Sequence, residues 1–328
     1  MNLFSRALAT GALAVLAGAG AIAVPAKAQD YPTRNITLIL PFAAGGPTDV
    51  ISRIVTGHMA QTLGQNIIIE NVVGAGGTTA TARAARAAND GYTLVTGHMG
   101  THAAAVPLYP KLAYNPEKDF EPVAMMAGTP ILILARKDFP AKDLKEFVAY
   151  VKANTEKLNA AHAGIGSVSN VSCELLNSLL GVKPVGVPFN GTGPAMNALI
   201  GGQVDYMCDQ IVNAVPQING GTIKAYAIAT AERNPSLPDV PTTAEAGLPA
   251  FQAQAWNAIF APKGTSPAII AKLNAAASKA LDDEGVRKRL LDLGSVIPNA
   301  AERTPEALGA LVKSEIEKWT PVLKPATN

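Results

Sequence analysis

Residues 36–50 read ITLIL, then PFAAGGPTD, then V, and this order predicts a strand, a glycine turn and a helix. The first five residues are apolar, as in a buried strand, and a helical pattern runs on to Leu63. Pro47 suits a first helical turn, and Thr48 and Asp49 are candidate caps. Helix N-termini carry unpaired N–H groups and partial positive charge, and glycine lets a ligand reach the backbone. The stretch therefore predicts a site for a small anion.

The N-terminal segment has the pattern of a secretory signal peptide. Arg6 precedes an apolar stretch that runs to Val24, and Ala26-Lys27-Ala28 matches an A-x-A cleavage pattern. A membrane anchor helix is the alternative, but the stretch is short, rich in Ala and Gly, and ends in small residues. We therefore expect cleavage after Ala28 and export of the mature chain to the periplasm.

The charge balance indicates how an anion could be held. The 328-residue chain has 27 basic and 25 acidic residues, and the segment 1–28 contributes Arg6 and Lys27 to the basic ones. The mature chain would thus carry 25 of each and be formally neutral. A neutral surface gives no support to nucleic-acid or anionic-membrane binding. An anionic ligand would then be held by local dipoles and hydrogen bonds.

The two cysteines, Cys173 and Cys208, form an isolated pair, which is a disulfide candidate in an oxidising compartment. The alternative is two buried thiols that pack as small apolar groups. Metal binding is not indicated, because the histidines are scattered and no C-x-x-C motif occurs. We expect a disulfide, and neither a metal nor a cofactor.

Apolar strands alternate with helical segments along the mature chain, which predicts α/β domains with mainly parallel sheets. Glycine turns open helices at four places, 45–49, 76–79, 164–169 and 191–195. Ligands of open α/β sheets bind at the carboxyl ends of the strands, so these turns could converge on one cleft. None of them supplies G-x-G-x-x-G in register, so a dinucleotide is not favoured.

About 300 mature residues fit two domains better than one. We expect the chain to cross between two lobes twice, near Gly128 and near Phe251. Two apolar runs flank the Gly-Thr-Pro break at the first of these crossings. The expected organisation is a signal peptide at 1–28, lobe 1 at 29–128 and 252–328, and lobe 2 at 129–251.

An exported hydrolase is the least favoured function. Ser167, His102 and an aspartate could be drawn as a triad, but the serine lacks the G-x-S-x-G elbow. The glycine turns carry hydroxyls and amides, which recognise a ligand without converting it. Phe42 could pack in the core or cover the ligand, and both roles stay open. We assign Asp49 to a helix cap, because a carboxylate would repel a bound anion.

Motifs spread along the mature chain are highly specific when taken together. They include Tyr31-Pro32, the stretch 39–49, Gly74-Ala75-Gly76-Gly77, Asp90-Gly91-Tyr92-Thr93-Leu94, Gly164-Ile165-Gly166-Ser167, Val187-Pro188-Phe189-Asn190-Gly191 and Gly201-Gly202-Gln203-Val204-Asp205. In these residues the chain resembles the Bordetella uptake gene (Bug) family. These proteins are the extracytoplasmic solute receptors of tripartite tricarboxylate transporters.

The resemblance implies a type II-like periplasmic binding protein, with two α/β lobes joined by crossing strands and a ligand cleft between them. Family members bind a carboxylate through the backbone of two loops, here 42–48 and 164–170. Asn170 stands where the family often has histidine, which removes a titratable group. The expected ligand-binding residues are Phe42, Ala43, Ala44, Gly45, Gly46, Thr48, Gly76, Gly77, Thr78, Thr101, His102, Gly166, Ser167, Val168, Ser169, Asn170, Asn190, Gly191, Thr192 and Asp209.

The resemblance also implies the partners and the absence of catalysis. The expected ligand is a small organic carboxylate, such as a dicarboxylate, and the expected protein partners are transmembrane permease subunits. We expect a monomer that closes around its ligand by hinge motion. A ligand-sensing receptor for a signalling system is the alternative. Aliphatic dicarboxylates, aromatic carboxylates and acidic amino acids all suit the same loops.

Overall fold

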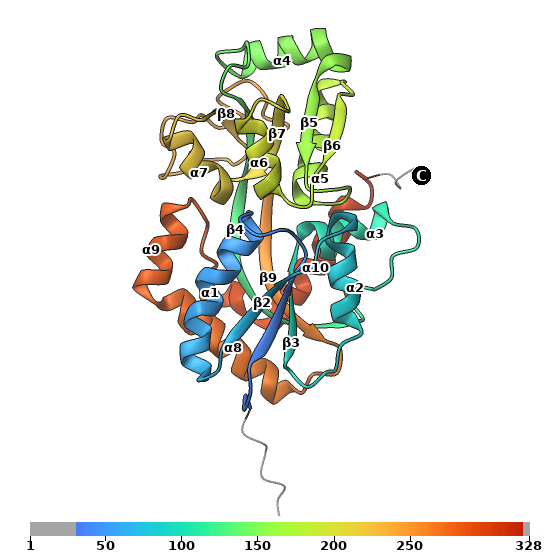
Figure 1. Cartoon of the computed structure of the whole chain (residues 1–328), viewed down its shortest axis with the longest axis vertical. Coiled ribbons are helices and arrows are strands. Elements are labelled where there is room, and N and C mark those ends of the chain that lie inside the picture. Colours follow the sequence, from blue (N-terminus) through green and yellow to red (C-terminus); the bar gives the residue numbers. More distant parts are fainter. Residues whose placement is uncertain (1–30, 324–328) are drawn as a thin grey trace, which may run out of the picture. The chain divides into compact units, whose positions relative to one another are not determined.

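The computed structural model describes residues 31–323, and the chain from Pro32 onward forms one compact unit. The predicted signal peptide and its cleavage site lie outside the described residues. The unit is a two-lobed α/β fold in which two long strands, β4 (Phe120–Arg136) and β9 (Gln254–Pro262), run side by side between the lobes (Figure 1). The predicted fold class is therefore confirmed.

The strands form one mixed sheet in the order β2-β1-β3-β9-β4-β7-β5-β6, with β8 also paired to β4. Strand β1 pairs in parallel with β2 and β3, and β5 pairs in parallel with β6 and β7. Each lobe thus has its own parallel group, whose carboxyl ends carry the glycine turns. The other strand bounds are β1 Ile36–Leu40, β2 Ile67–Asn71, β3 Thr93–His98, β5 Asn159–His162, β6 Val185–Pro188, β7 Tyr206–Gln210 and β8 Ile223–Ile228.

Helices cover the sheet in both lobes, as the alternation in the sequence predicts (Figure 1). In lobe 1 they are α1 Pro47–Leu63, α2 Thr78–Ala85, α3 Ala105–Leu108, α8 Pro267–Asp282, α9 Glu284–Asp292 and α10 Pro305–Trp319, with short turns of other helix types at 75–77, 100–104 and 300–303. In lobe 2 they are α4 Leu144–Asn154, α5 Val168–Leu180, α6 Thr192–Ile200 and α7 Ile211–Asn219, with a further short turn at 155–157. Helix α7 was not predicted, because Pro216 lies inside it and interrupts the helical pattern.

The two apolar runs around Gly128 form one continuous strand, β4, where the sequence predicts two strands and a break. The Gly-Thr-Pro segment is the place where β4 changes partners. It pairs with β9 as far as Pro130 and with β7 from Ile131. Proline has no N–H to donate to a ladder, and this point between two sets of partners tolerates it.

Each lobe has its own aromatic centre. Phe120 and Phe260 are buried edge to face in lobe 1, with ring centroids 6.3 Å apart. Phe147 and Tyr206 pack in the same way in lobe 2, at 5.5 Å. Burying one such side chain stabilises the fold by about 1.5–3 kcal/mol. The lobes are therefore well-packed bodies that hold the loops at their edges in place.

The predicted disulfide is wrong for this structure. Cys173 on α5 and Cys208 on β7 are free, buried cysteines whose Sγ atoms lie 2.7 Å apart, beyond the bond length of about 2.05 Å. The Cys208 N–H donates to Cys173 Sγ at 2.9 Å. Burial raises the pKa of the Cys208 thiol well above its ordinary value. Packing of α5 on β7 does bring the pair together, but as two free cysteines.

Candidate ligand-binding site

The first jaw of the site is the loop 41–48, which joins β1 to α1. Helix α1 begins at Pro47, as predicted, but its N-cap is Gly46 and has no side-chain hydrogen bond. Thr48 and Asp49 were predicted as caps and lie inside the helix instead. The first N–H groups of α1 therefore have no acceptor from a capping side chain.

Asp49 holds the first jaw from behind. Its Oδ2 accepts hydrogen bonds from the Gly45 N–H at 3.1 Å and from Arg53 Nε at 2.9 Å. Asn71 Nδ2 donates to Asp49 Oδ1 at 3.2 Å and to the Phe42 carbonyl at 2.8 Å. Burial disfavours the charged carboxylate, but the hydrogen bonds from Arg53, Gly45 and Asn71 outweigh it and hold the pKa below its ordinary value. Asp49 is thus an ionised carboxylate whose charge Arg53 balances.

The second jaw is the turn 164–170, which joins β5 to α5, and it satisfies its own hydrogen bonds. Ser167 Oγ caps α5 by accepting from the Asn170 N–H at 3.2 Å. Asn170 Oδ1 accepts from the Gly166 N–H at 3.0 Å, and Ser169 Oγ accepts from the Ala163 N–H at 2.9 Å. These side chains fix the shape of the turn.

The N-termini of four helices, α1, α5, α6 and α7, meet at one small pocket between the jaws. Of these helices, α1, α6 and α7 have no side-chain cap. The pocket volume is about 20 Å³. It is lined by Phe42, Ala43, Gly46, Pro47, Thr48, Asp49, His98, Ala163, Ser167, Val168, Ser169, Thr192 and Gln210. Several partial positive charges converging on one point favour an anion.

The two lobes are closed on each other at the edges of the pocket. The Ala43 N–H donates to the Asn190 carbonyl at 2.9 Å. Tyr109 Oη, from lobe 1, donates to the Ile165 carbonyl at 2.6 Å. Gly76 lies so near the same carbonyl that a Cβ added there would overlap its oxygen. Glycine is therefore required at position 76 for the lobes to meet in this way.

A buried polar network forms the base of the pocket between the crossing strands. Gln210 Oε1 accepts from Thr129 Oγ1 on β4 at 2.7 Å and from Asn257 Nδ2 on β9 at 3.0 Å. Thr48 Oγ1, from the first jaw, donates to Asn257 Oδ1 at 3.1 Å. The network links the first jaw, both crossing strands and the start of α7.

The structure brings part of the predicted site together. Predicted residues that line the pocket are Phe42, Ala43, Gly46, Thr48, Ser167, Val168, Ser169 and Thr192. Gly76 and Asn190 line an adjoining hollow that also includes Phe42. Ala44, Gly45, Gly77, Thr78, Thr101, His102, Gly166, Asn170, Gly191 and Asp209 are not among the residues that line either space.

Two residues that were predicted to contact the ligand, His102 and Asp209, pack against other side chains in this structure. His102 stacks on Phe260 with centroids 4.0 Å apart, inside the aromatic centre of lobe 1. The carboxyl of Asp209 is fully buried and accepts from Asn213 Nδ2 at 2.6 Å. Burial raises the pKa of Asp209 to about 7, although hydrogen bonds from Asn213, Gln210 and Thr192 oppose the change.

Five residues that line the pocket were not among the predicted contacts, namely Pro47, Asp49, His98, Ala163 and Gln210. His98 and Gln210 lie at the carboxyl ends of β3 and β7, and each is a near neighbour of a residue that was predicted. Position at a strand end was the available signal. His102 was predicted because it belongs to the Thr101-His102 motif. The path of the chain after β3 instead places the ring of His98 at the pocket.

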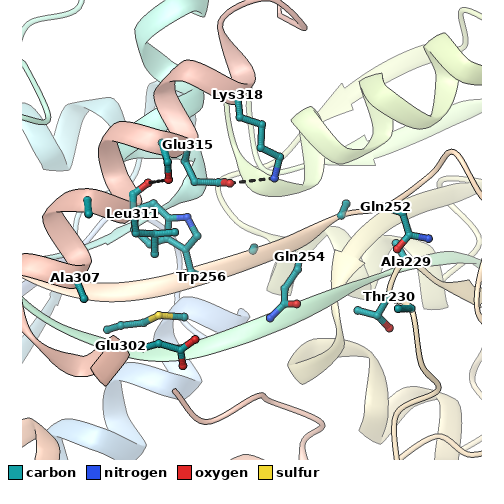
Figure 2. A pocket seen from close by; sticks show the side chains of 16 residues that line it. Ala229, Thr230, Gln252, Gln254, Trp256, Glu302, Ala307, Leu311, Glu315 and Lys318 are labelled. Carbon is teal, nitrogen blue, oxygen red and sulfur yellow. Dashed lines mark hydrogen bonds and ion pairs between the residues drawn. The ribbon is translucent and has the colours of Figure 1, made fainter. Parts of the chain in front are cut away.

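A larger hollow of about 730 Å³ lies between β9 and α10, away from the jaws (Figure 2). Trp256 lies beneath Leu311 there, and Lys318 pairs with Glu315 at 2.9 Å. Two carboxylates, Glu302 and Glu315, line this hollow. Its two carboxylates outnumber its one cation, Lys318, whereas Arg53 balances Asp49 at the pocket between the jaws, so the hollow favours an anion less despite its size.

Two further observations concern residues 31–323. No group of three or more His, Cys, Asp or Glu side chains in this range is placed to hold a metal ion. No helix in the same range combines the length and apolar character needed to cross a bilayer. The pocket itself offers hydroxyl, amide, imidazole and backbone groups, which bind a ligand through hydrogen bonds.

Comparison with known proteins identifies the family. The model of the tripartite tricarboxylate transporter family receptor, TctC, matches residues 51–327. MatC from Rhodopseudomonas palustris, solved with bound malate, is 60% identical with a TM-score of 0.87, over 89% of this chain and 99% of that one. A second R. palustris protein, solved with adipate, is 30% identical with a TM-score of 0.85, over 90% and 100%. BugT of Bordetella pertussis is 33% identical over 99% of this chain and 98% of its own.

These relatives are solute-binding proteins without catalytic activity, so the hydrolase considered from the sequence is excluded. The similarity to the Bug family, expected from the motifs, is confirmed over nearly the whole chain. The chain therefore belongs to the TctC family of tripartite tricarboxylate transporter receptors, which are periplasmic solute-binding proteins.

Proposed function

We propose that this protein captures a small organic acid, a dicarboxylate or a related carboxylate, and delivers it unchanged to a tripartite transporter. The observation that carries the proposal is the meeting of four helix N-termini from two lobes at one pocket. Such termini bind anions through backbone N–H groups and dipoles. The malate and adipate in the two R. palustris structures support an acid of this class.

Hinge closure is the proposed mechanism. The lobes, taken as 29–128 with 252–328 and as 129–251, would rotate about the places where β4 and β9 cross between them. The pocket volume of about 20 Å³ is little more than the ~10–15 Å³ that one water needs. The jaws must therefore separate to admit an organic acid. Ligand contacts with both jaws would then select the closed form.

Binding measurements on the mature chain, residues 29–328, test this proposal. We expect malate, succinate or adipate to raise the Tm. At a ligand concentration of 100 times the Kd, binding should add about 2.7 kcal/mol to the free energy of unfolding. Succinamide, which keeps the shape of succinate without its charges, is the control and should leave the Tm unchanged. Equal shifts with succinate and succinamide, or no shift with any carboxylate, would overturn the anion site.

Delivery to permease subunits is tested in cells. We expect deletion of the gene to abolish uptake of the labelled acid that binds best, and the Gly76→Ala variant described below to fail to restore it. Normal uptake with a lost transcriptional response to that acid would support the sensing role instead. The exported protein should elute as a monomer, and N-terminal sequencing should begin at Gln29, in line with cleavage after Ala28.

A further inference from the structure

His98 has a buried ring nitrogen without a hydrogen-bond partner. Six buried side-chain polar atoms in residues 31–323 lack a partner, and His98 Nε2 is the one that belongs to a residue lining the pocket between the jaws. The side chain is fully buried. Buried polar groups are almost always satisfied, so an unsatisfied one needs a partner, and at a pocket a bound ligand is able to supply it.

The hydrogen bonds at the other ring nitrogen determine where the proton lies. Backbone N–H groups of Gly100 and Thr101 both donate to His98 Nδ1, at 2.8 and 3.3 Å. An atom that accepts from two N–H groups carries no proton of its own. The neutral ring must therefore carry its proton on Nε2, which makes Nε2 a donor. Burial lowers the pKa of His98 to about 3, so the ring is neutral at ordinary pH.

The position of the ring places it beside both jaws. His98 ends β3, and its ring stacks on Phe42 of the first jaw with centroids 5.1 Å apart. A Cβ added to Gly100 would lie 2.6 Å from His98 Cε1 and 2.5 Å from the Gly166 carbonyl oxygen of the second jaw. The imidazole therefore lies close to both of the loops that border the pocket.

We infer that His98 is a ligand-binding residue, whose Nε2–H donates a hydrogen bond to an oxygen of the captured carboxylate. This inference rests on the proposed function and adds a specific side chain to it. The contact uses a neutral donor, so it provides direction without placing a full positive charge in the pocket. A donor fixed by two backbone hydrogen bonds selects acids with an acceptor oxygen at one position.

Two substitutions separate the two nitrogens of the ring. In His98→Asn, Oδ1 lies near the former Nδ1 position and can still accept from Gly100 and Thr101, but the Nε2 donor is lost. In His98→Gln, the amide nitrogen lies near the former Nε2 position, and the acceptor for the turn is lost. With malate as the ligand in calorimetry, we expect His98→Asn to bind about tenfold or more weakly, with a Tm near wild type without ligand. His98→Gln should show the reverse pattern, a lower Tm and an affinity closer to wild type.

The outcomes distinguish this inference from the proposed function. Wild-type affinity for malate in a folded His98→Asn protein would overturn the inference alone. A wild-type protein that binds none of malate, succinate and adipate would overturn both. If His98→Asn does not fold, the wild-type protein with ¹⁵N-labelled histidine provides the test. Saturating malate should shift the Nε2–H resonance of His98 and slow its exchange with water, and an unchanged resonance would overturn the inference.

Discussion

The two jaws have the same plan and use their polar groups differently. Each is a glycine turn between a parallel strand and a helix. The first jaw is held from behind by Asn71 and Asp49, and its helix has no side-chain cap. The second holds itself, with Ser167 and Asn170 bonded to its own backbone. The first jaw therefore keeps N–H groups for a ligand, and the second contributes mainly shape. The number of hydroxyl and amide side chains beside a glycine turn therefore does not predict how many of these side chains contact the ligand.

The largest effect is expected where lobe 1 touches the second jaw, at Gly76. In Gly76→Ala the new Cβ would overlap the Ile165 carbonyl, so lobe closure should be blocked and affinity for malate should fall about 100-fold. Gly64→Ala is the matched control. The φ of Gly64 is 70°, close to the 61° of Gly76, but a Cβ added to Gly64 would have no neighbour within 4 Å. It should bind malate normally and lose only the stability that the left-handed backbone costs. Similar affinities in the two variants would show that contact at Gly76 is not needed for binding.

Asp209, whose carboxyl is fully buried in lobe 2, tests whether that lobe holds a protonated, neutral acid next to Gln210. Its pKa is raised to about 7 from 3.8, so the folded state holds a proton that the unfolded state releases. The contribution of Asp209 to the free energy of unfolding should therefore be greatest below pH 4. It should fall as pH rises to 7, by at most about 1.4 kcal/mol per pH unit. Above pH 7 this contribution levels off.

Urea unfolding of wild type and Asp209→Asn at pH 5, 6, 7 and 8 measures that slope. Because other groups titrate alike in both proteins, the difference between their stabilities isolates Asp209. Between pH 5 and 7, the free energy of unfolding of wild type should fall relative to that of Asp209→Asn. A constant difference across the series would mean that Asp209 titrates near its ordinary pKa.

A smaller effect should separate the supports of the two jaws. Asn170→Ala removes the acceptor for the Gly166 N–H, and Asn71→Ala removes the donor to the Phe42 carbonyl. Each should reduce stability by about 1 kcal/mol. We expect malate affinity to fall further in Asn71→Ala, because the first jaw presents the N–H groups to the ligand. Calorimetry on both variants checks this, and a greater loss in Asn170→Ala would reverse our ranking of the jaws.

The sequence predicted the fold well where local pattern and packing agree. Helix α1 has Pro47 in its first turn and ends at Leu63, as predicted, and both jaws lie at the expected glycine turns. Prediction failed where distant segments decide. The Gly-Thr-Pro segment resembles a break, yet pairing with β9 and β7 makes it one strand. For the same reason, residue type could not show that Gln210 borders the pocket while Asp209 faces Asn213.

The smallest effect concerns a single hydrogen bond across the cleft. Tyr109 Oη lies 2.6 Å from the Ile165 carbonyl and 3.1 Å from the Ala75 carbonyl. One hydroxyl proton can serve only one of them, and Ala75 belongs to the same lobe as Tyr109, so the open form can keep that alternative bond. Tyr109→Phe should then weaken malate binding only about two- to fivefold, mainly through faster dissociation. Stopped-flow measurement of the dissociation rate, with Tyr150→Phe on α4 as the control, would show whether this bond holds the jaws closed or merely follows their closure.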